Sequence, residues 1–134
     1  MKYLLITFFL FFSLTSIGQS LRSYNYGKLS LTGKVVLKDL RHPINGKVIK
    51  DAMVLVLPQP VKFIPNPESE EEDTATTREI RIYGDIMKNV NPNMKYKAII
   101  GKKVTITANY EFAPSGNYPL LVNIIEDFSY KIIE

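Results

Sequence analysis

The sequence has no cysteine, no tryptophan and one histidine, His42, and these absences exclude several kinds of site. Without cysteine the chain forms no disulfide, thiol nucleophile or thiolate metal site, and a single histidine excludes any site built from two. The remaining composition, 46% apolar and 22% charged in 134 residues, is typical of a globular protein. A chain of this length forms one domain that folds without a metal or a disulfide. We therefore expect no cofactor and no metal ion.

The N-terminus has the three parts of a secretory signal peptide. Lys2 supplies the positive charge, residues 3–14 form an apolar run, and Ser16 and Gly18 are the small residues before a cleavage site. The run is too short for a membrane-spanning helix, and no later run approaches that length. The sequence predicts a signal peptide at residues 1–18 and a soluble protein exported to the periplasm or the medium. An uncleaved anchor or a buried first strand is the alternative.

Charge is unevenly distributed along the chain. The formal net charge is +4, and five of the thirteen acidic residues lie between Glu68 and Asp73. Because this acidic stretch is flanked by prolines, we expect an exposed, mobile loop, and the rest of the domain is then basic. For an exported protein, polyanions of the cell envelope, phospholipid head groups and acidic protein surfaces are accessible partners, whereas nucleic acid is not an expected one.

Alternation of apolar and polar residues predicts the main β-strands. Residues 28–38 alternate strictly, with a bend expected at Gly33. Residues 51–57 form a central strand that Pro58 and Pro60 should close, with a short extension at residues 61–64. Residues 19–27 show no such pattern and are predicted to be a leader with little structure. Further strands are expected at residues 78–83, 104–112 and 120–125, with a short C-terminal segment at residues 128–133.

One short helical turn is expected between the third and fourth strands. Asn91 and Pro92 suit the cap and the first position of a helix. Five strands, one short helix and a closing hairpin predict a mainly β fold: a single OB-fold-like barrel of five to six strands that spans residues 28–134. A six-stranded sandwich is the alternative.

Four segments of the chain resemble the bacterial domain-of-unknown-function family 4431. They are YGKLSLTG at residues 26–33, VLVLPQP at 54–60, GKKVTITA at 101–108 and YPLLV at 118–122. The resemblance implies an exported protein with an OB-like domain, and it implies no activity. Members of the family often carry histidines in the turn before the last strand, whereas residues 113–119 contain none.

Two conspicuous features have ordinary interpretations that we favour. His42, next to a proline, is expected to be a solvated turn residue, because no serine, aspartate or cysteine motif completes a catalytic unit with it. The acidic run at residues 68–73 lacks the alternating ligands and the central glycine of a calcium-binding loop. We therefore assign no catalytic residue and no metal ligand.

The candidate ligand-binding residues are basic and aromatic. Lys102 and Lys103, together with Lys95 and Lys97, bracket the fourth strand and could hold an anion, although lysines at strand edges also prevent strands from pairing edge to edge. Tyr83 and Tyr118 are the tyrosines expected on a barrel surface, where OB-folds stack sugars or bases.

The sequence as a whole favours a non-enzymatic, exported, monomeric barrel that binds a ligand or protein of the cell envelope. An inhibitor or immunity-type protein that blocks an envelope enzyme is the second hypothesis. A hydrolase that uses carboxylates such as Glu79 and Glu111 is the third, and it requires the two groups to face each other across a cleft.

We predict that the mature protein begins at Gln19 and is recovered outside the cytoplasm, because a cleavage site follows the apolar run. Intact-mass measurement of the exported protein checks this. Recovery of a membrane-embedded chain that retains residues 1–18 would contradict it.

Overall fold

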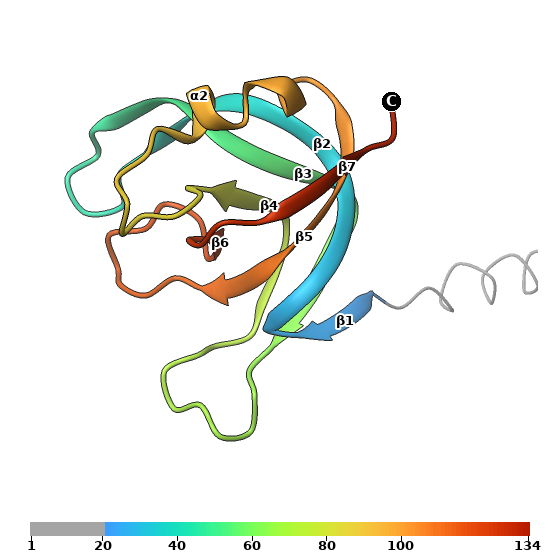
Figure 1. Cartoon of the computed structure of the whole chain (residues 1–134). Coiled ribbons are helices and arrows are strands. Elements are labelled where there is room, and N and C mark those ends of the chain that lie inside the picture. Colours follow the sequence, from blue (N-terminus) through green and yellow to red (C-terminus); the bar gives the residue numbers. More distant parts are fainter. Residues whose placement is uncertain (1–20) are drawn as a thin grey trace, which may run out of the picture.

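The computed structural model describes residues 21–134, so the predicted signal peptide lies outside the described residues. The described part contains seven strands, one short α-helix and one 3-10 turn (Figure 1). Their bounds are β1 Arg22–Asn25, β2 Gly27–Arg41, β3 Val48–Ile64, β4 Ala75–Ile82, α2 Pro92–Lys95, η1 Lys97–Ile99, β5 Lys103–Phe112, β6 Val122–Ile124 and β7 Ser129–Ile132. No helix in this part of the chain is long and apolar enough to cross a membrane.

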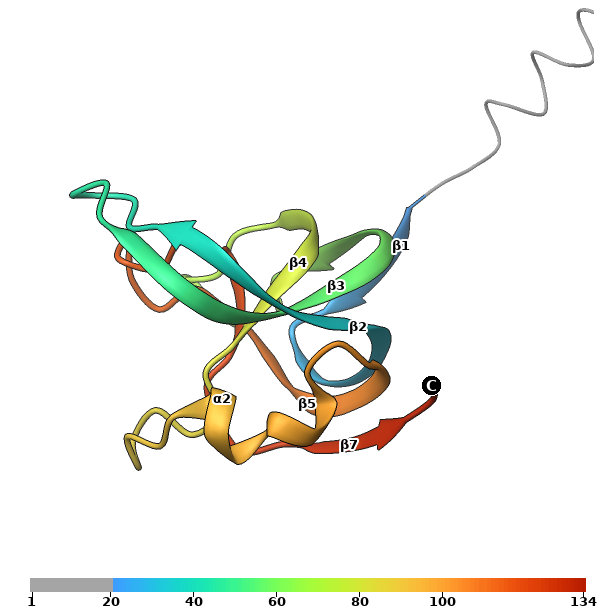
Figure 2. The same ribbon diagram turned by 90° about the horizontal axis from the view of Figure 1, so that it is seen from above.

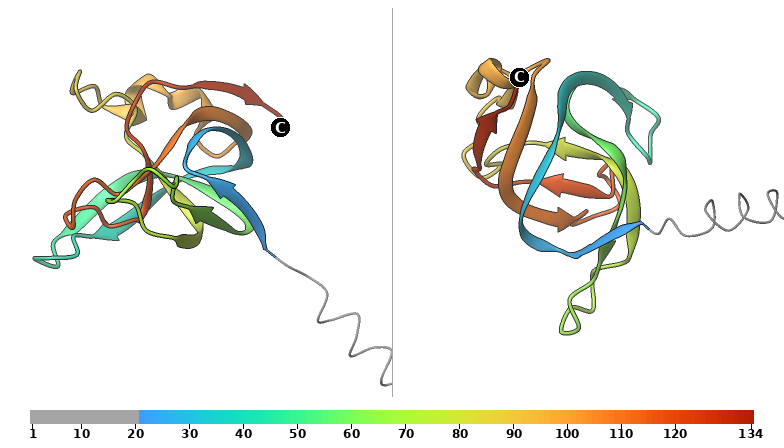
Figure 3. Two further views of the ribbon diagram at one scale, coloured as in Figure 1. Left: turned by 90° about the horizontal axis from the view of Figure 1, so that it is seen from below. Right: turned by 90° about the vertical axis from the view of Figure 1, so that its right-hand side faces the viewer.

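Five of the strands close into a ring. The sheet runs β1-β3-β2-β5-β6-β4, and β4 pairs back with β3, so that β3, β2, β5, β6 and β4 enclose one interior (Figure 3). The pairs within the ring are antiparallel except β4 with β6, which is parallel. β1 and β7 extend the sheet along β3 and β5. The predicted mainly β, barrel-like fold is confirmed, and the alternative sandwich is not formed.

The interior of the ring is the main hydrophobic core. On β5 the predicted alternation is confirmed, since Val104, Ile106, Ala108 and Tyr110 are all buried. The Tyr110 hydroxyl donates a hydrogen bond to the Ile106 carbonyl oxygen (2.8 Å), which satisfies the one polar atom of this fully buried side chain. The ring of Phe63 stacks at 6.4 Å from that of Tyr110, so β3 and β5 meet across the barrel interior.

The helix begins where the sequence predicts. The Asn91 side chain accepts a hydrogen bond from the backbone N–H of Asn93 (3.0 Å), and Pro92 is the first helical residue. The helix has only four residues, between β4 and β5, and lies beside the barrel rather than in its core.

The predicted unstructured leader is wrong for residues 22–26. β1 pairs in parallel with Val61–Ile64 of β3, and Tyr26 is buried with its ring stacked 5.7 Å from that of Phe63. A strand of four residues is too short to show periodicity, and its partner lies some forty residues away in the sequence, so local pattern could not reveal it.

Pro58 and Pro60 do not close a strand, contrary to the sequence prediction. β3 continues through both of them to Ile64. They lie between Val56, the last residue paired with β2, and Val61, the first paired with β1, in a bulge that also interrupts the pairing with β4. Because residues 57–60 have no ladder partner, the missing N–H of proline costs no hydrogen bond there.

At Gly33, where the sequence predicts a bend, the backbone of β2 crosses close to that of β3. A Cβ atom at this position would lie 2.4 Å from the carbonyl oxygen of Val56. β2 pairs with β5 from Gly27 to Lys34, and with β3 only from Lys34 onwards (Figure 2). At Gly33 β2 therefore changes partners, and its first half separates from β3.

We predict that Ile106→Ala lowers the free energy of unfolding by about 2 to 5 kcal/mol, the cost of removing a fully buried aliphatic side chain. Thr107→Ala should cost far less, since the Thr107 hydroxyl makes one exposed hydrogen bond to Ser30. Urea denaturation of both variants checks the difference. A larger loss from Thr107→Ala would contradict the register of β5.

We also predict that Gly33→Ala destabilises the fold by about 1 to 3 kcal/mol, because the new methyl group would collide with the Val56 backbone. Gly116→Ala is the matched control: no atom lies within 4 Å of a Cβ there, and the change should stay within about 0.5 kcal/mol. Thermal denaturation compares the two. Equal effects would show that β2 and β3 do not approach closely in solution.

Candidate anion-binding groove

A groove opens where β2 and β3 separate. It consists of two pockets, of about 480 and 710 Å³, which share Thr32, Leu57 and Pro58 as lining residues. Each pocket falls within the size range usual for small-molecule sites. We call them the inner pocket, beneath β1, and the outer pocket, beside Lys34 and Lys103.

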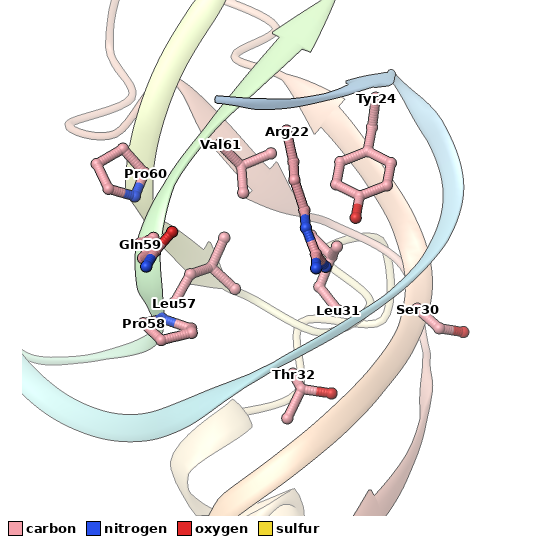
Figure 4. Close-up of a pocket in the computed structure, with 10 residues that line it drawn as sticks. All are labelled: Arg22, Tyr24, Ser30, Leu31, Thr32, Leu57, Pro58, Gln59, Pro60 and Val61. Carbon is pink, nitrogen blue, oxygen red and sulfur yellow. The ribbon is translucent and has the colours of Figure 1, made fainter. Parts of the chain in front are cut away.

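The inner pocket has an apolar floor. Leu31, Leu57 and Val61 line it, and each is at least nine-tenths buried. Arg22 and Tyr24 extend into it from β1, with the guanidinium and the phenol hydroxyl directed towards Leu31 (Figure 4). The inner pocket therefore combines a hydrocarbon surface with one cationic group and one hydroxyl donor.

Two other hydroxyl groups at this pocket already have partners. Ser30 hydrogen-bonds to Thr107, and Thr32 to Thr105, each with an oxygen–oxygen distance of 2.7 Å between β2 and β5. By contrast, none of the described carboxylates forms an ion pair with Arg22. Arg22 is thus the group in the inner pocket best able to bind an anion.

The outer pocket gathers positive charge. Lys34 on β2 and Lys103 on β5 are direct cross-strand partners, and both line this pocket together with Arg78 of β4. Like charges placed directly opposite each other destabilise a sheet by about 0.2 to 1 kcal/mol. Glu134 is the one acidic residue that lines the pocket. The outer pocket therefore has an excess of cations, which a bound anion would compensate.

Arg78 also holds the bulge of β3 in place. Its Nε–H donates to the carbonyl oxygen of Leu57 at 3.1 Å, which satisfies a backbone acceptor left without a ladder partner. Among the described residues its terminal nitrogens have no other partner, so they remain available to a ligand in the outer pocket. One side chain thus shapes the groove and contributes to its charge.

The structure separates the predicted site residues. Lys103 lines the outer pocket, whereas the adjacent Lys102 lines neither pocket. The backbone of Lys102 accepts a hydrogen bond from the Val35 N–H (3.0 Å) and donates one to the Ile99 carbonyl oxygen (3.1 Å). The sequence places Lys34 on the outward face of a strand, Arg22 in the predicted leader and Arg78 at the start of a strand, so none of the three is a predicted site residue. Only the pairing of β2 with β5, of β1 with β3 and of β3 with β4 brings them to the groove.

Tyr83 and Tyr118 contact each other away from the groove. Their rings meet edge to face with centroids 5.4 Å apart, and the Arg81 guanidinium lies 4.1 Å from the Tyr83 centroid while donating to its hydroxyl (2.8 Å). Burial raises the pKa of Tyr83, and the charge of Arg81 opposes this rise. Both tyrosines are half-buried and engaged with each other, so they fix the loop at residues 113–121 against β4.

His42 and the acidic stretch make local contacts. Nδ1 of His42 accepts hydrogen bonds from the backbone N–H groups of Ile44 (3.2 Å) and Asn45 (3.4 Å), which organises the β2–β3 turn. Glu72 accepts from the Asn66 N–H (3.1 Å), and the Tyr26 hydroxyl donates to the Asp73 carbonyl oxygen (2.7 Å). The acidic loop is exposed, as predicted, but its base is held against β1.

Comparison of the chain with protein-family models, with curated protein sequences and with solved structures gives no match. The resemblance to family 4431 therefore stays a prediction.

Proposed function

We propose that this protein is a non-enzymatic binding protein, exported from the cytoplasm, that holds a small amphiphilic anion of the cell envelope in the groove between β2 and β3. The anionic group would lie between Lys34, Lys103 and Arg78, and the apolar part would lie on Leu31 and Leu57. A ligand of this class satisfies both halves of the groove at once, since the two pockets share their central residues.

The opposed pair Lys34 and Lys103 carries the proposal. The two lysines lie directly opposite each other, next to Arg78, whose Nε already donates to a backbone carbonyl. Their positive charges repel each other, and a bound anion would reduce this repulsion. Lysine at a strand edge can also serve to prevent edge pairing, but Lys34 and Lys103 are paired with each other, as the last pair of the β2–β5 ladder, rather than placed along a free edge. A ligand explains their position better than edge protection does.

The strand order supports the OB-like part of the proposal. In the ring, β2, β3 and β4 follow one another, α2 precedes β5, and β6 returns between β5 and β4 with a parallel pairing to β4. This is the Greek-key order expected of an OB-fold. Export rests on the N-terminal sequence alone, and the resemblance to family 4431 agrees with it.

The two carboxylates of the hydrolase hypothesis lie on strands that are not neighbours, and Glu111 Oε2 is buried with no hydrogen-bond partner among the described residues. Glu79 forms an ion pair with Lys38 on the outside of the sheet. Glu111 lies on β5 opposite Asn123 of β6, and burial, reinforced by the charges of Glu126 and Glu72, raises its pKa. Since β6 separates β5 from β4, the arrangement favours a binding protein over a hydrolase. An inhibitor of an envelope enzyme remains the alternative within the binding class.

We predict that octyl phosphate binds to the groove and that Lys103→Met weakens its affinity at least about tenfold, because one charged hydrogen bond of about 1.5 to 3 kcal/mol is lost. The adjacent Lys102→Met is the matched control and should leave affinity within about twofold, as its side chain lines neither pocket. Isothermal titration calorimetry measures both. Without the probe, Lys103→Met should raise the melting temperature slightly, since it removes the repulsion with Lys34.

Failure of octyl phosphate to bind the unmodified protein would contradict the proposal. An equal loss of affinity in Lys102→Met and Lys103→Met would also contradict it, because it would indicate a general effect of net charge. Titration with inorganic phosphate and with octanol separates the contributions of the anionic group and the apolar chain.

A further inference from the structure

Three loops lie at the end of the barrel that is far from the groove. They are residues 42–47 between β2 and β3, residues 83–91 between β4 and α2, and residues 113–121 between β5 and β6; we call their common surface the loop end (Figures 1 and 2). Figures 1 and 2 place the three loops at the same end of the molecule, with residues 42–47 and residues 83–91 on opposite sides of that end (Figure 2). The groove is lined by the opposite half of β2, around Thr32.

Side-chain contacts hold these loops together. The rings of Tyr83 and Tyr118 join the second loop to the third. Leu120 packs into a small apolar cluster outside the barrel that contains Leu40 and Ile49, which joins the third loop to the β2–β3 hairpin. The loop end is therefore one connected surface, with its apolar tips held in a defined arrangement.

Each loop exposes a large apolar side chain. Ile44 is 71% exposed, Met87 90% and Leu121 51%. Six of the twelve exposed large hydrophobic residues in the described part of the chain lie on or directly beside these loops: Ile44, Val48, Ile86, Met87, Val90 and Leu121. Half of the exposed large hydrophobic residues of the described part thus lie at one end of the barrel.

Positive charge lies beside one of the three apolar tips, that of the β2–β3 hairpin. Arg41, Lys47 and Lys50 lie on the hairpin, and no carboxylate of residues 21–134 forms an ion pair with any of them. The second loop adds no free positive charge, because the ammonium of Lys88 lies 3.7 Å from the carboxylate of Asp85 and 3.3 Å from that of Asp127.

Two more carboxylates lie farther from the tip of the hairpin. Asp39 and Asp51 are joined across it, where the Asp51 N–H donates to the Asp39 carboxylate (3.1 Å). At its tip the hairpin therefore presents the exposed side chain of Ile44 between Arg41 and Lys47.

We propose that the loop end docks onto an anionic phospholipid surface. Ile44, Met87 and Leu121 would enter the head-group region, and the hairpin cations would contact lipid phosphates, which combines the two terms that drive interfacial binding. Apolar groups carried singly on separate loop tips suit a soft bilayer better than the flat face of a protein. In this orientation the groove, at the other half of β2, stays open to solvent.

The test is flotation with vesicles of phosphatidylglycerol and phosphatidylcholine, compared with vesicles of phosphatidylcholine alone. It uses the chain from Gln19, which contains every described strand and the whole core. We expect binding to the anionic vesicles that weakens as salt is added. Ile44→Asp/Met87→Asp should reduce binding more than about tenfold, since each substitution replaces an inserting side chain by a like-charged repulsion.

Ile132→Asp/Ile133→Asp is the matched control, because it adds the same charge at exposed apolar positions outside the loop end (44% and 47% exposed). It should reduce binding within about twofold to threefold. Absence of flotation, or an equal loss in the control, would overturn the proposal. So would self-association in sedimentation that Ile44→Asp/Met87→Asp abolishes without any vesicle binding, because the loop end would then cover a second copy of this chain. Circular dichroism and a melting curve establish that both variants are folded.

Discussion

The close crossing of β2 and β3 at Gly33 is the constraint on which the rest of the structure depends. A backbone carbonyl occupies the space where any other residue would place its Cβ atom. The approach lets one fifteen-residue strand serve two neighbours in turn, β5 along its first half and β3 along its second. A strand shared in this way is what turns a sheet into a closed ring. The same crossing forces β2 and β3 apart on its other side, so closure of the barrel and opening of the groove have a common cause.

The chemistry of the groove follows from its position beside this crossing. Lys34, the next residue along, is the one position of β2 that pairs with both neighbours, and it is therefore held opposite Lys103. Arg78 reaches the same place because the bulge of β3 leaves the Leu57 carbonyl oxygen in need of a donor. The strand crossing at Gly33 and the bulge of β3 thus bring cations together beside the apolar floor of the groove. A fold that tolerates such repulsion is expected to have a use for it.

Local pattern in the sequence predicted the elements whose determinants are local. Alternation on residues 104–112 gave the correct inward and outward faces, and Asn91 with Pro92 gave the start of the helix. It failed for β1, which is four residues long and is stabilised by a distant parallel partner, and for Pro58 and Pro60, which a strand can contain only because that stretch is unpaired. Of the four candidate ligand-binding residues, only Lys103 lies at the groove. The other cations of the groove could not be predicted, because pairings between strands that are distant in the sequence bring them there and no local pattern encodes such pairings.

Pro58 and Pro60 also prevent intermolecular strand pairing at the gap between β2 and β3. An unpaired stretch of strand ordinarily promotes aggregation, because a strand of another molecule can form hydrogen bonds with its free N–H and C=O groups. Along residues 57–60, two of the four backbone nitrogens carry no hydrogen, and the carbonyl of Leu57 is already occupied by Arg78. A foreign strand would find too few donors to form a ladder. The gap between β2 and β3 can therefore admit a small molecule without allowing copies of the protein to associate through strand pairing.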